Sequence, residues 1–106
     1  MDRILHIELS KYSLNLGSRM LGRQVLDDIN GQIGSYSKIV LDFKNVRFMS
    51  LSFATELIDA LQFHFKEENM DFIDANSFIK SQINFVLKTN RQSKGLVEQS
   101  QIKVAA

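Results

Sequence analysis

Segment 38–61 constrains the fold more than any other part of the sequence, because it combines a buried strand, a turn and an amphipathic helix. Residues 39–43 are almost continuously apolar, as in a strand that is covered on both faces, and Lys44-Asn45 is a typical turn pair. Ser50 and Ser52 then open a helix. The free N–H groups at the start of such a helix favour negative charge. Its apolar residues recur at helical spacing, namely Ala54, Leu57, Ile58, Leu61 and Phe65.

The segments on either side predict further strands. Residues 4–9 alternate between apolar and polar side chains, which is typical of a strand, and residues 70–75 predict another. Residues 11–16 also alternate and predict a short strand or an extended loop. We therefore expect residues 39–43 at the centre of a sheet, with residues 4–9 and 72–75 on either side of them.

Two more helices are expected. Ser18 is a suitable N-cap for a helix that ends at Asn30-Gly31 or at Gly34-Ser35. Its buried side is expected to hold Leu21, Val25 and Ile29, together with Ile33 if the helix extends that far. Either Asn76 or Ser77 caps a third helix, whose buried side is expected to consist of Ile79, Ile83, Val86 and Leu87.

Alternating strands and helices predict an α/β fold, with an α+β arrangement as the alternative. We expect about four mostly parallel strands and three helices, with helices covering the sheet. The chain has 106 residues and 44% hydrophobic side chains, enough for the core of one domain over residues 1–106. Residues 90–106 are expected to form a loose C-terminal tail or an edge strand.

The composition argues against several classes of protein. The 13 basic and 12 acidic residues give a net charge of +1 and look scattered along the chain, so no nucleic-acid partner is expected. The chain has no cysteine, and no apolar run is long enough for a membrane span. We expect a cytoplasmic protein without a membrane partner. The sequence leaves the oligomeric state open.

The residues that commonly carry catalysis form no catalytic pattern here. His6 and His64 are far apart in the sequence and lack the spacing of metal ligands. The acidic residues that could be imagined as a pair for acid–base chemistry lie at the predicted margins of a helix and a strand, namely Glu67, Glu68, Asp71 and Asp74. Gly17 and Gly22 do not have the spacing of a phosphate-binding loop. We expect no enzyme activity, no metal and no cofactor.

The segment from Leu41 to Leu57 resembles the central motif of STAS-like domains. It is most similar to the STAS-like domain family of unknown function. The motif of that family has an Asp-Phe strand end, a valine and then Ser-Phe-Ala-x-Glu-Leu, which is Ser52-Phe-Ala-Thr-Glu-Leu57 here. Gly17-Ser-Arg-Met-Leu-Gly-Arg23 resembles the serine-arginine start of a helix in the same family. The resemblance covers roughly residues 3–88, and its most specific part is residues 52–57.

The wider STAS family includes anti-sigma-factor antagonists, which are switched by phosphorylation of a serine at the start of this helix. Their loop reads Met-Asp-Ser-Ser-Gly. If Met49 is placed on that methionine, Leu51 replaces the phosphorylated serine and Phe53 replaces the glycine. The partner-switching mechanism therefore cannot be transferred unchanged. Ser52 is the nearest remaining hydroxyl and the candidate for phosphorylation.

The resemblance implies a non-catalytic regulatory protein-interaction module in a bacterial signalling or partner-switching system. Its implied partner is a histidine-kinase-like ATPase or a serine-kinase regulator. The surface expected to bind the partner consists of Arg19, Arg47, Ser50, Leu51, Ser52, Phe53 and Thr55. The alternative is a sensor that binds a small ligand or nucleotide anion at the same helix N-terminus. The simplest explanation of the two serines is that they only cap the helix.

Overall fold

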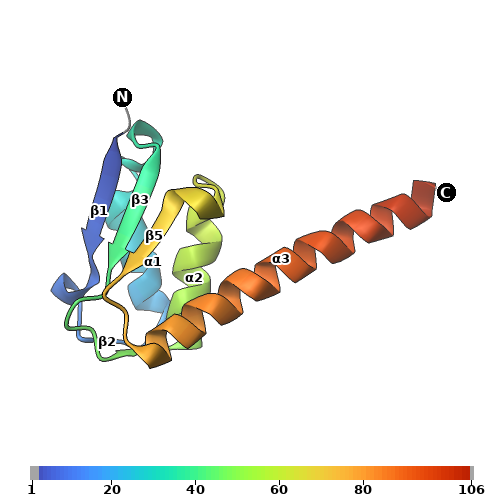
Figure 1. The fold of residues 1–106 in the computed structure, drawn as a ribbon. Helices are drawn as coiled ribbons and strands as arrows, with labels where there is room; N and C mark the ends of the chain where they lie inside the picture. The colour runs from blue at the N-terminus through green and yellow to red at the C-terminus, as the bar shows by residue number, and fades with distance from the viewer. Residues whose placement is uncertain (1–2, 106) are drawn as a thin grey trace.

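The computed structural model describes the backbone of residues 3–105 and the side chains of residues 3–92. It shows an α/β fold with three helices (Figure 1). Three parallel strands form the main sheet in the order β1 (Ile4–Glu8), β3 (Lys38–Asp42) and β5 (Met70–Ile73). The predicted central strand and its two neighbours are confirmed.

Two further short strands form a second parallel sheet that is separate from the main one. Strand β2 (Asn15–Leu16) pairs with β4 (Phe48–Met49), where the sequence predicted one sheet of about four strands. The turn after β3 explains the difference. Asn45 adopts a left-handed conformation with φ of 69°, which redirects the chain so that Arg47 donates its N–H to the carbonyl oxygen of Leu14 at 2.8 Å.

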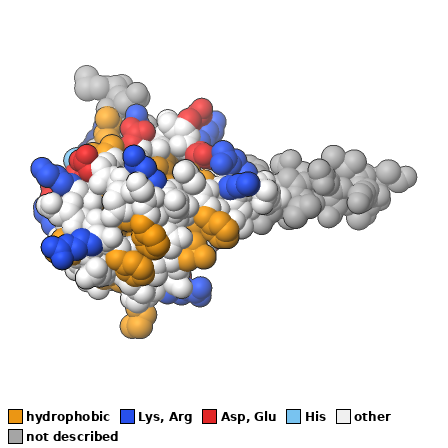
Figure 2. Space-filling model, turned by 60° about the horizontal axis from the view of Figure 1, so that its bottom comes forward, with side chains coloured by type: hydrophobic (Ala, Val, Ile, Leu, Met, Phe, Trp, Pro, Cys, Tyr) orange, Lys and Arg blue, Asp and Glu red, His pale blue; other side chains and the backbone are white. Residues whose placement is uncertain are grey.

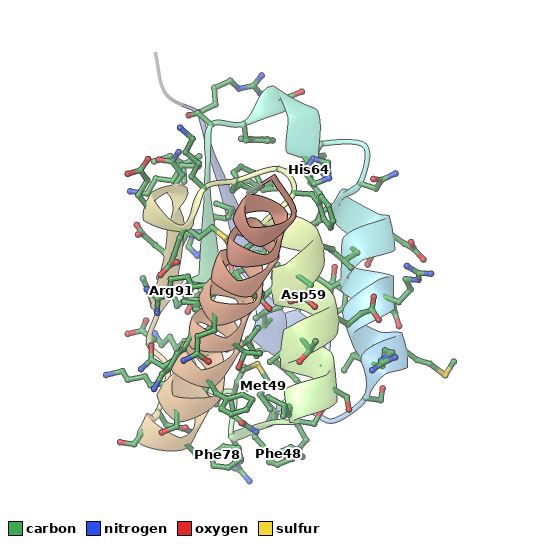
Figure 3. All side chains as sticks on the ribbon, turned by 90° about the vertical axis from the view of Figure 1, so that its right-hand side faces the viewer. Phe48, Met49, Asp59, His64, Phe78 and Arg91 are labelled. Atoms are coloured by element: carbon green, nitrogen blue, oxygen red, sulfur yellow. The ribbon has the colours of Figure 1, made fainter. Side chains whose placement is uncertain are left out.

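The helices cover one face of the main sheet (Figure 3). Inward-pointing residues of β1 and β3 are buried, as in Leu5 and Leu41, whereas alternate residues are exposed or half-buried. The expectation of cover on both faces is wrong. The expectation failed because successive side chains of a strand point to opposite faces of the sheet. On the uncovered face, the apolar Val40 lies between the polar side chains of His6 and Asp42.

The three helices begin at the same end of the domain, beyond the carboxyl ends of the strands (Figure 1). They are α1 (Arg19–Ile29), α2 (Leu51–Leu61) and α3 (Ser77–Ala105). Ser18 caps α1 by accepting a hydrogen bond from Leu21 N–H at 3.1 Å, as predicted. Asn76, one of the two predicted candidates, caps α3 in the same way. The predicted buried side of α3 is confirmed at Ile79, Ile83, Val86 and Leu87.

Two predicted helix boundaries are wrong. Helix α2 ends at Leu61, and Phe65 reaches the core from the turn that follows, so its burial does not require a longer helix. Helix α3 continues to Ala105, where a loose tail or edge strand was predicted for residues 90–106. The sequence of residues 90–105 contains no proline and several good helix formers such as Gln, Lys and Arg, so its polarity is compatible with a helix. Residue 106 lies outside the described residues.

Short 3₁₀ turns complete the fold at Leu9–Lys11, Ile33–Ser35 and Glu67–Asn69. The hydrophobic core lies between the sheet and the helices. Its fully buried members include Leu9, Leu16, Ile39, Leu41, Phe43, Met49, Phe53, Leu57, Ile58, Leu61 and Ile79. The core extends to the end of the domain where the helices begin, because three of its buried members lie there, namely Leu16, Met49 and Phe53.

Candidate interaction surface at the start of helix α2

Ser50 caps helix α2, and it does so directly after strand β4. Its Oγ accepts a hydrogen bond from Phe53 N–H at 3.0 Å, and its own N–H donates to the carbonyl oxygen of Leu16 at 2.9 Å. Ser50 has the extended backbone of a cap residue, with φ of −74° and ψ of 157°. Ser52 already lies within the first turn and is exposed. Of the two serines that were expected to open the helix, Ser50 is therefore the cap.

Phe53 was predicted to belong to the partner-binding surface, and this prediction is wrong. The side chain is fully buried among the core residues, whereas Leu51 and Ser52 are exposed and Thr55 is half-buried. Phe53 is four residues before Leu57 and eight before Leu61, so it lies on their face of the helix. That spacing was readable in the sequence.

The two predicted arginines have different environments. Arg19 Nε lies 3.7 Å from Glu56 Oε1, and Arg23 Nη1 lies 4.0 Å from the other oxygen of the same carboxylate. These ion pairs connect α1 to α2 across a close helix–helix contact at Gly22, where an added Cβ would lie 3.3 Å from the carbonyl oxygen of Phe53.

Arg47 is exposed and lines a hollow with a volume of about 540 Å³. The other residues that line it are Leu14, Asn45, Val46 and Asn76. The carbonyl oxygen of Arg47 accepts a hydrogen bond from Asn76 Nδ2 at 3.1 Å. The lining residues come from three loops and include none from the first turn of α2, so Arg47 and the helix N-terminus do not share this hollow.

Leu51, which was predicted to belong to the partner-binding surface, is accompanied by three half-exposed aromatic side chains that sequence reasoning missed. The rings of Phe48 and Phe78 stack with their centroids 5.6 Å apart and their planes 19° apart (Figure 3). Leu51 follows them at the first position of α2, and Phe85 lies seven residues after Phe78, on the same side of α3. The exposed fractions are 40% for Phe48, 40% for Leu51, 48% for Phe78 and 55% for Phe85. We call these four residues the apolar patch.

Gln82 places this side of α3 against the start of α2. Its Nε2 donates a hydrogen bond to the carbonyl oxygen of Met49 at 3.3 Å, and it lies between Phe78 and Phe85 along the helix. One signal in the sequence pointed to the patch: Phe78 and Phe85 are seven residues apart but do not share the spacing of Ile79, Ile83 and Val86.

A second hollow, of about 320 Å³, lies farther along the same two helices. Asp59, Gln62, Phe63 and Asn90 line it. Asn90 Nδ2 donates to Asp59 Oδ1 at 2.7 Å and to Gln62 Oε1 at 2.6 Å. These bonds use the polar groups of the hollow to hold α2 against α3, so they have a structural role.

The remaining candidates for chemistry are dispersed. His6 lies on the open face of the sheet with its Nε2 3.2 Å from Asp42 Oδ2, and His64 is exposed in the turn after α2. Glu67 pairs with Arg91 and Asp71 with Lys38. Within the described residues, no group of three or more His, Asp or Glu side chains is placed to hold a metal ion. Over the same part of the chain, no helix is long and apolar enough to span a membrane.

Comparisons with protein-family models, curated proteins and solved structures found no match to this chain. The similarity to STAS-like domains therefore depends on the motif residues quoted above.

Proposed function

We propose that this chain is a non-catalytic regulatory protein-interaction module that binds a partner protein through the apolar patch. The observation that carries the proposal is a set of four large apolar side chains, each about half exposed, on neighbouring elements. They are the stacked pair Phe48 and Phe78, Leu51 at the first position of α2, and Phe85 seven residues beyond Phe78 on α3. Such a cluster is typical of the centre of a protein–protein interface, where aromatic residues supply most of the binding energy. The similarity to STAS-like domains supports the same region as the working surface.

The patch is held in place before any partner binds. Asn76 fixes the loop before α3 to Arg47, and Gln82 fixes α3 to Met49. Directly beneath, Met49 and Phe53 are buried in the core. Because few side chains would have to be immobilised on binding, a rigid patch of this size favours affinity.

Ser52 supplies a site at which the interaction could be regulated. Its hydroxyl is exposed in the first turn of α2, next to Leu51 in the apolar patch. A phosphate there would add about two negative charges. The helix N-terminus tolerates negative charge, but an apolar contact with a partner does not. Phosphorylation of Ser52 would therefore leave the fold intact and release the partner.

In its full form, the proposal places the protein in a bacterial cytoplasmic signalling or partner-switching system. The similarity to STAS-like domains favours a histidine-kinase-like ATPase or a serine-kinase regulator as the partner. The mechanism differs from that of the anti-sigma-factor antagonists, because Leu51 occupies the place of their phosphorylated serine and contributes apolar contact area instead.

Binding to the partner is tested by affinity purification from the native cells with matched variants as bait. Phe78→Ser removes one ring of the stacked pair, and Phe63→Ser removes an even more exposed ring, at 88%, outside the apolar patch. A protein that is retained by the wild type and by Phe63→Ser, but lost with Phe78→Ser and Ser52→Asp, supports the proposal. If every protein retained by the wild type is also retained by Phe78→Ser, the apolar patch is not the binding surface.

The second candidate function is a sensor of a small anion or nucleotide, which the position of Arg47 in a hollow favours. A cationic side chain in a concave site is a common anion-binding arrangement. Titration of isotope-labelled protein with phosphate and with nucleotides, followed by NMR, tests it. Saturable shifts at Asn45, Arg47 and Asn76 that disappear in Arg47→Gln would favour the sensor. Unchanged spectra would exclude these ligands.

A further inference from the structure

The net charge of +1 hides a strong separation of charge. Segments 9–26, 43–55 and 75–89 contain no Asp or Glu. They hold seven of the 13 basic residues, namely Lys11, Arg19, Arg23, Lys44, Arg47, Lys80 and Lys88. These segments contain strands β2 and β4, the loops before the three helices, and the N-terminal part of each helix, which is 19–26 of α1, 51–55 of α2 and 77–89 of α3. We call them together the basic end of the domain.

The basic end is also the most apolar part of the exposed surface. Among the side chains that the structure describes, nine large hydrophobic residues are exposed, and this end carries six of them, namely Leu14, Met20, Phe48, Leu51, Phe78 and Phe85. Figure 2 views the molecule with this end forward and shows hydrophobic side chains near its centre, with Lys and Arg side chains around them and no acidic side chain among them. Basic and apolar groups therefore occupy one continuous surface.

Acidic residues from outside the three segments neutralise only part of this charge. Glu56 is shared by Arg19 and Arg23, and Lys11 Nζ lies 3.9 Å from Glu8 Oε1. Asp74 lines a hollow together with Lys44 and Lys80. Glu56 thus faces two cations, Asp74 shares its hollow with two, and Arg47, beside Phe48 in the sequence, adds a further positive charge. A surplus of positive charge remains around the apolar patch.

We propose that the partner of this module presents an acidic amphipathic segment to the basic end. This inference rests on the proposed function and specifies the chemistry of the partner. Apolar side chains of the segment contact Phe48, Leu51, Phe78 and Phe85. Its carboxylates face Arg47 and the neighbouring lysines. Complementary charge of this kind speeds association and selects the correct partner, and the apolar contacts keep the partner bound.

The shape of the apolar patch favours a protein segment over a membrane or a nucleic acid. Its side chains are only about half exposed, so only part of each is available for insertion into the boundary between headgroups and acyl chains of a lipid surface. Met20, at 83%, is the one clearly projecting side chain among the six. Binding of single-stranded nucleic acid uses open aromatic faces. Phe48 and Phe78 cover one face of each other by stacking, and Leu51 has no ring. Within the patch, this leaves Phe85 as the ring that is not stacked on another.

Selection of random peptides displayed on phage against the full-length protein tests this inference. We expect the enriched peptides to be rich in Asp and Glu and to carry apolar residues at helical spacing. Synthetic copies of the enriched peptides should bind with an affinity that falls as salt concentration rises. Arg47→Glu should weaken their binding by about tenfold or more, as is typical for reversing a charge at a complementary interface. Phe78→Ser and Phe85→Ser should weaken it to a similar degree.

Two control variants lie away from the basic end. Phe63→Ser and Lys66→Glu change an exposed ring and an exposed cation after α2, and both should leave peptide binding within about twofold. Thermal unfolding of every variant shows whether it is folded. If Phe78→Ser is unfolded, Phe85→Ser at a more exposed position gives the same information.

The outcomes separate this inference from the proposed function. Enriched peptides without acidic bias that still require Phe78 would overturn the inference and leave the proposed function standing. If no peptide is enriched, or if Phe78→Ser and Phe85→Ser do not affect binding, both fail. Binding of phosphatidylserine vesicles or of a single-stranded oligonucleotide more tightly than the best peptide would overturn the inference in favour of a membrane or a nucleic acid.

Discussion

Replacing Ser50 by alanine is expected to destabilise the protein, whereas the same replacement at Ser52 is not. Ser50 Oγ accepts the hydrogen bond from Phe53 N–H at 3.0 Å in a partly buried position. Without the hydroxyl, this N–H loses its partner at a place that water reaches only in part. Ser52 is exposed within the first turn, and alanine is the better helix former there.

The size of the difference follows from these environments. Loss of an N-cap costs about 0.5–2 kcal/mol, and the partly buried donor places Ser50→Ala in the upper half of that range. Ser52→Ala should change the free energy of unfolding by no more than about 0.5 kcal/mol, as is usual for exposed sites. Ser50→Asp should retain most of the stability, because a carboxylate also caps and suits the positive end of the helix dipole.

Urea-induced unfolding of the wild type and the three variants, followed by circular dichroism, measures these differences. For a domain of this size, each kcal/mol should also shift Tm by roughly 4–8 °C. A variant Ser52→Ala that is as destabilised as Ser50→Ala, or more so, would refute the assignment of Ser50 as the cap. The position of Ser52 as a free hydroxyl for regulation would then be refuted with it.

Three further predictions concern other parts of the fold. Gly22→Leu should cost about 1–3 kcal/mol in urea unfolding, because α1 has no room for a side chain against the Phe53 carbonyl; an unchanged midpoint would contradict this. Asn45→Val should cost about 1–2 kcal/mol and Asn45→Gly little, since φ is 69°; equal effects would argue against the left-handed turn. Burial, aided by the hydrogen bond to Asp28, raises the pKa of Tyr12 from 10.0 to about 12. The phenol loses its proton more readily in the unfolded chain than in the folded one. The stability that Tyr12 contributes is therefore fully present below pH 10 and is lost between pH 10 and about 12. Tyr12→Phe should show a smaller fall over that range, and an equal fall would refute the shift.

Much of the fold could be predicted because hydrophobic patterns determine it locally. The apolar run at residues 39–43 identified the central strand, and the spacing of Ile79, Ile83 and Val86 identified the buried side of α3. Ser18 was correctly predicted as a cap because a good cap residue directly precedes a periodic segment.

The rest depends on how distant segments meet. The apolar patch needs Phe48 from one strand and Phe78 from the start of another helix, and no local pattern says that their rings stack. The separation of charge could not be seen in the sequence for the same reason. The three segments without acidic residues are far apart along the chain and come together only when it folds. The burial of Phe53 was missed because the similarity to the family's loop outweighed the helical spacing that places it with Leu57.

The central claim, that the apolar patch is the surface that meets the partner, is tested most directly by photo-crosslinking inside the native cells. A benzophenone amino acid is placed in turn at Phe85, in the patch, and at Phe63, an exposed ring outside it. We predict a crosslinked protein adduct from position 85 that is absent from position 63 and disappears when Ser52 is changed to aspartate. Adducts from position 63 and none from position 85 would contradict the claim.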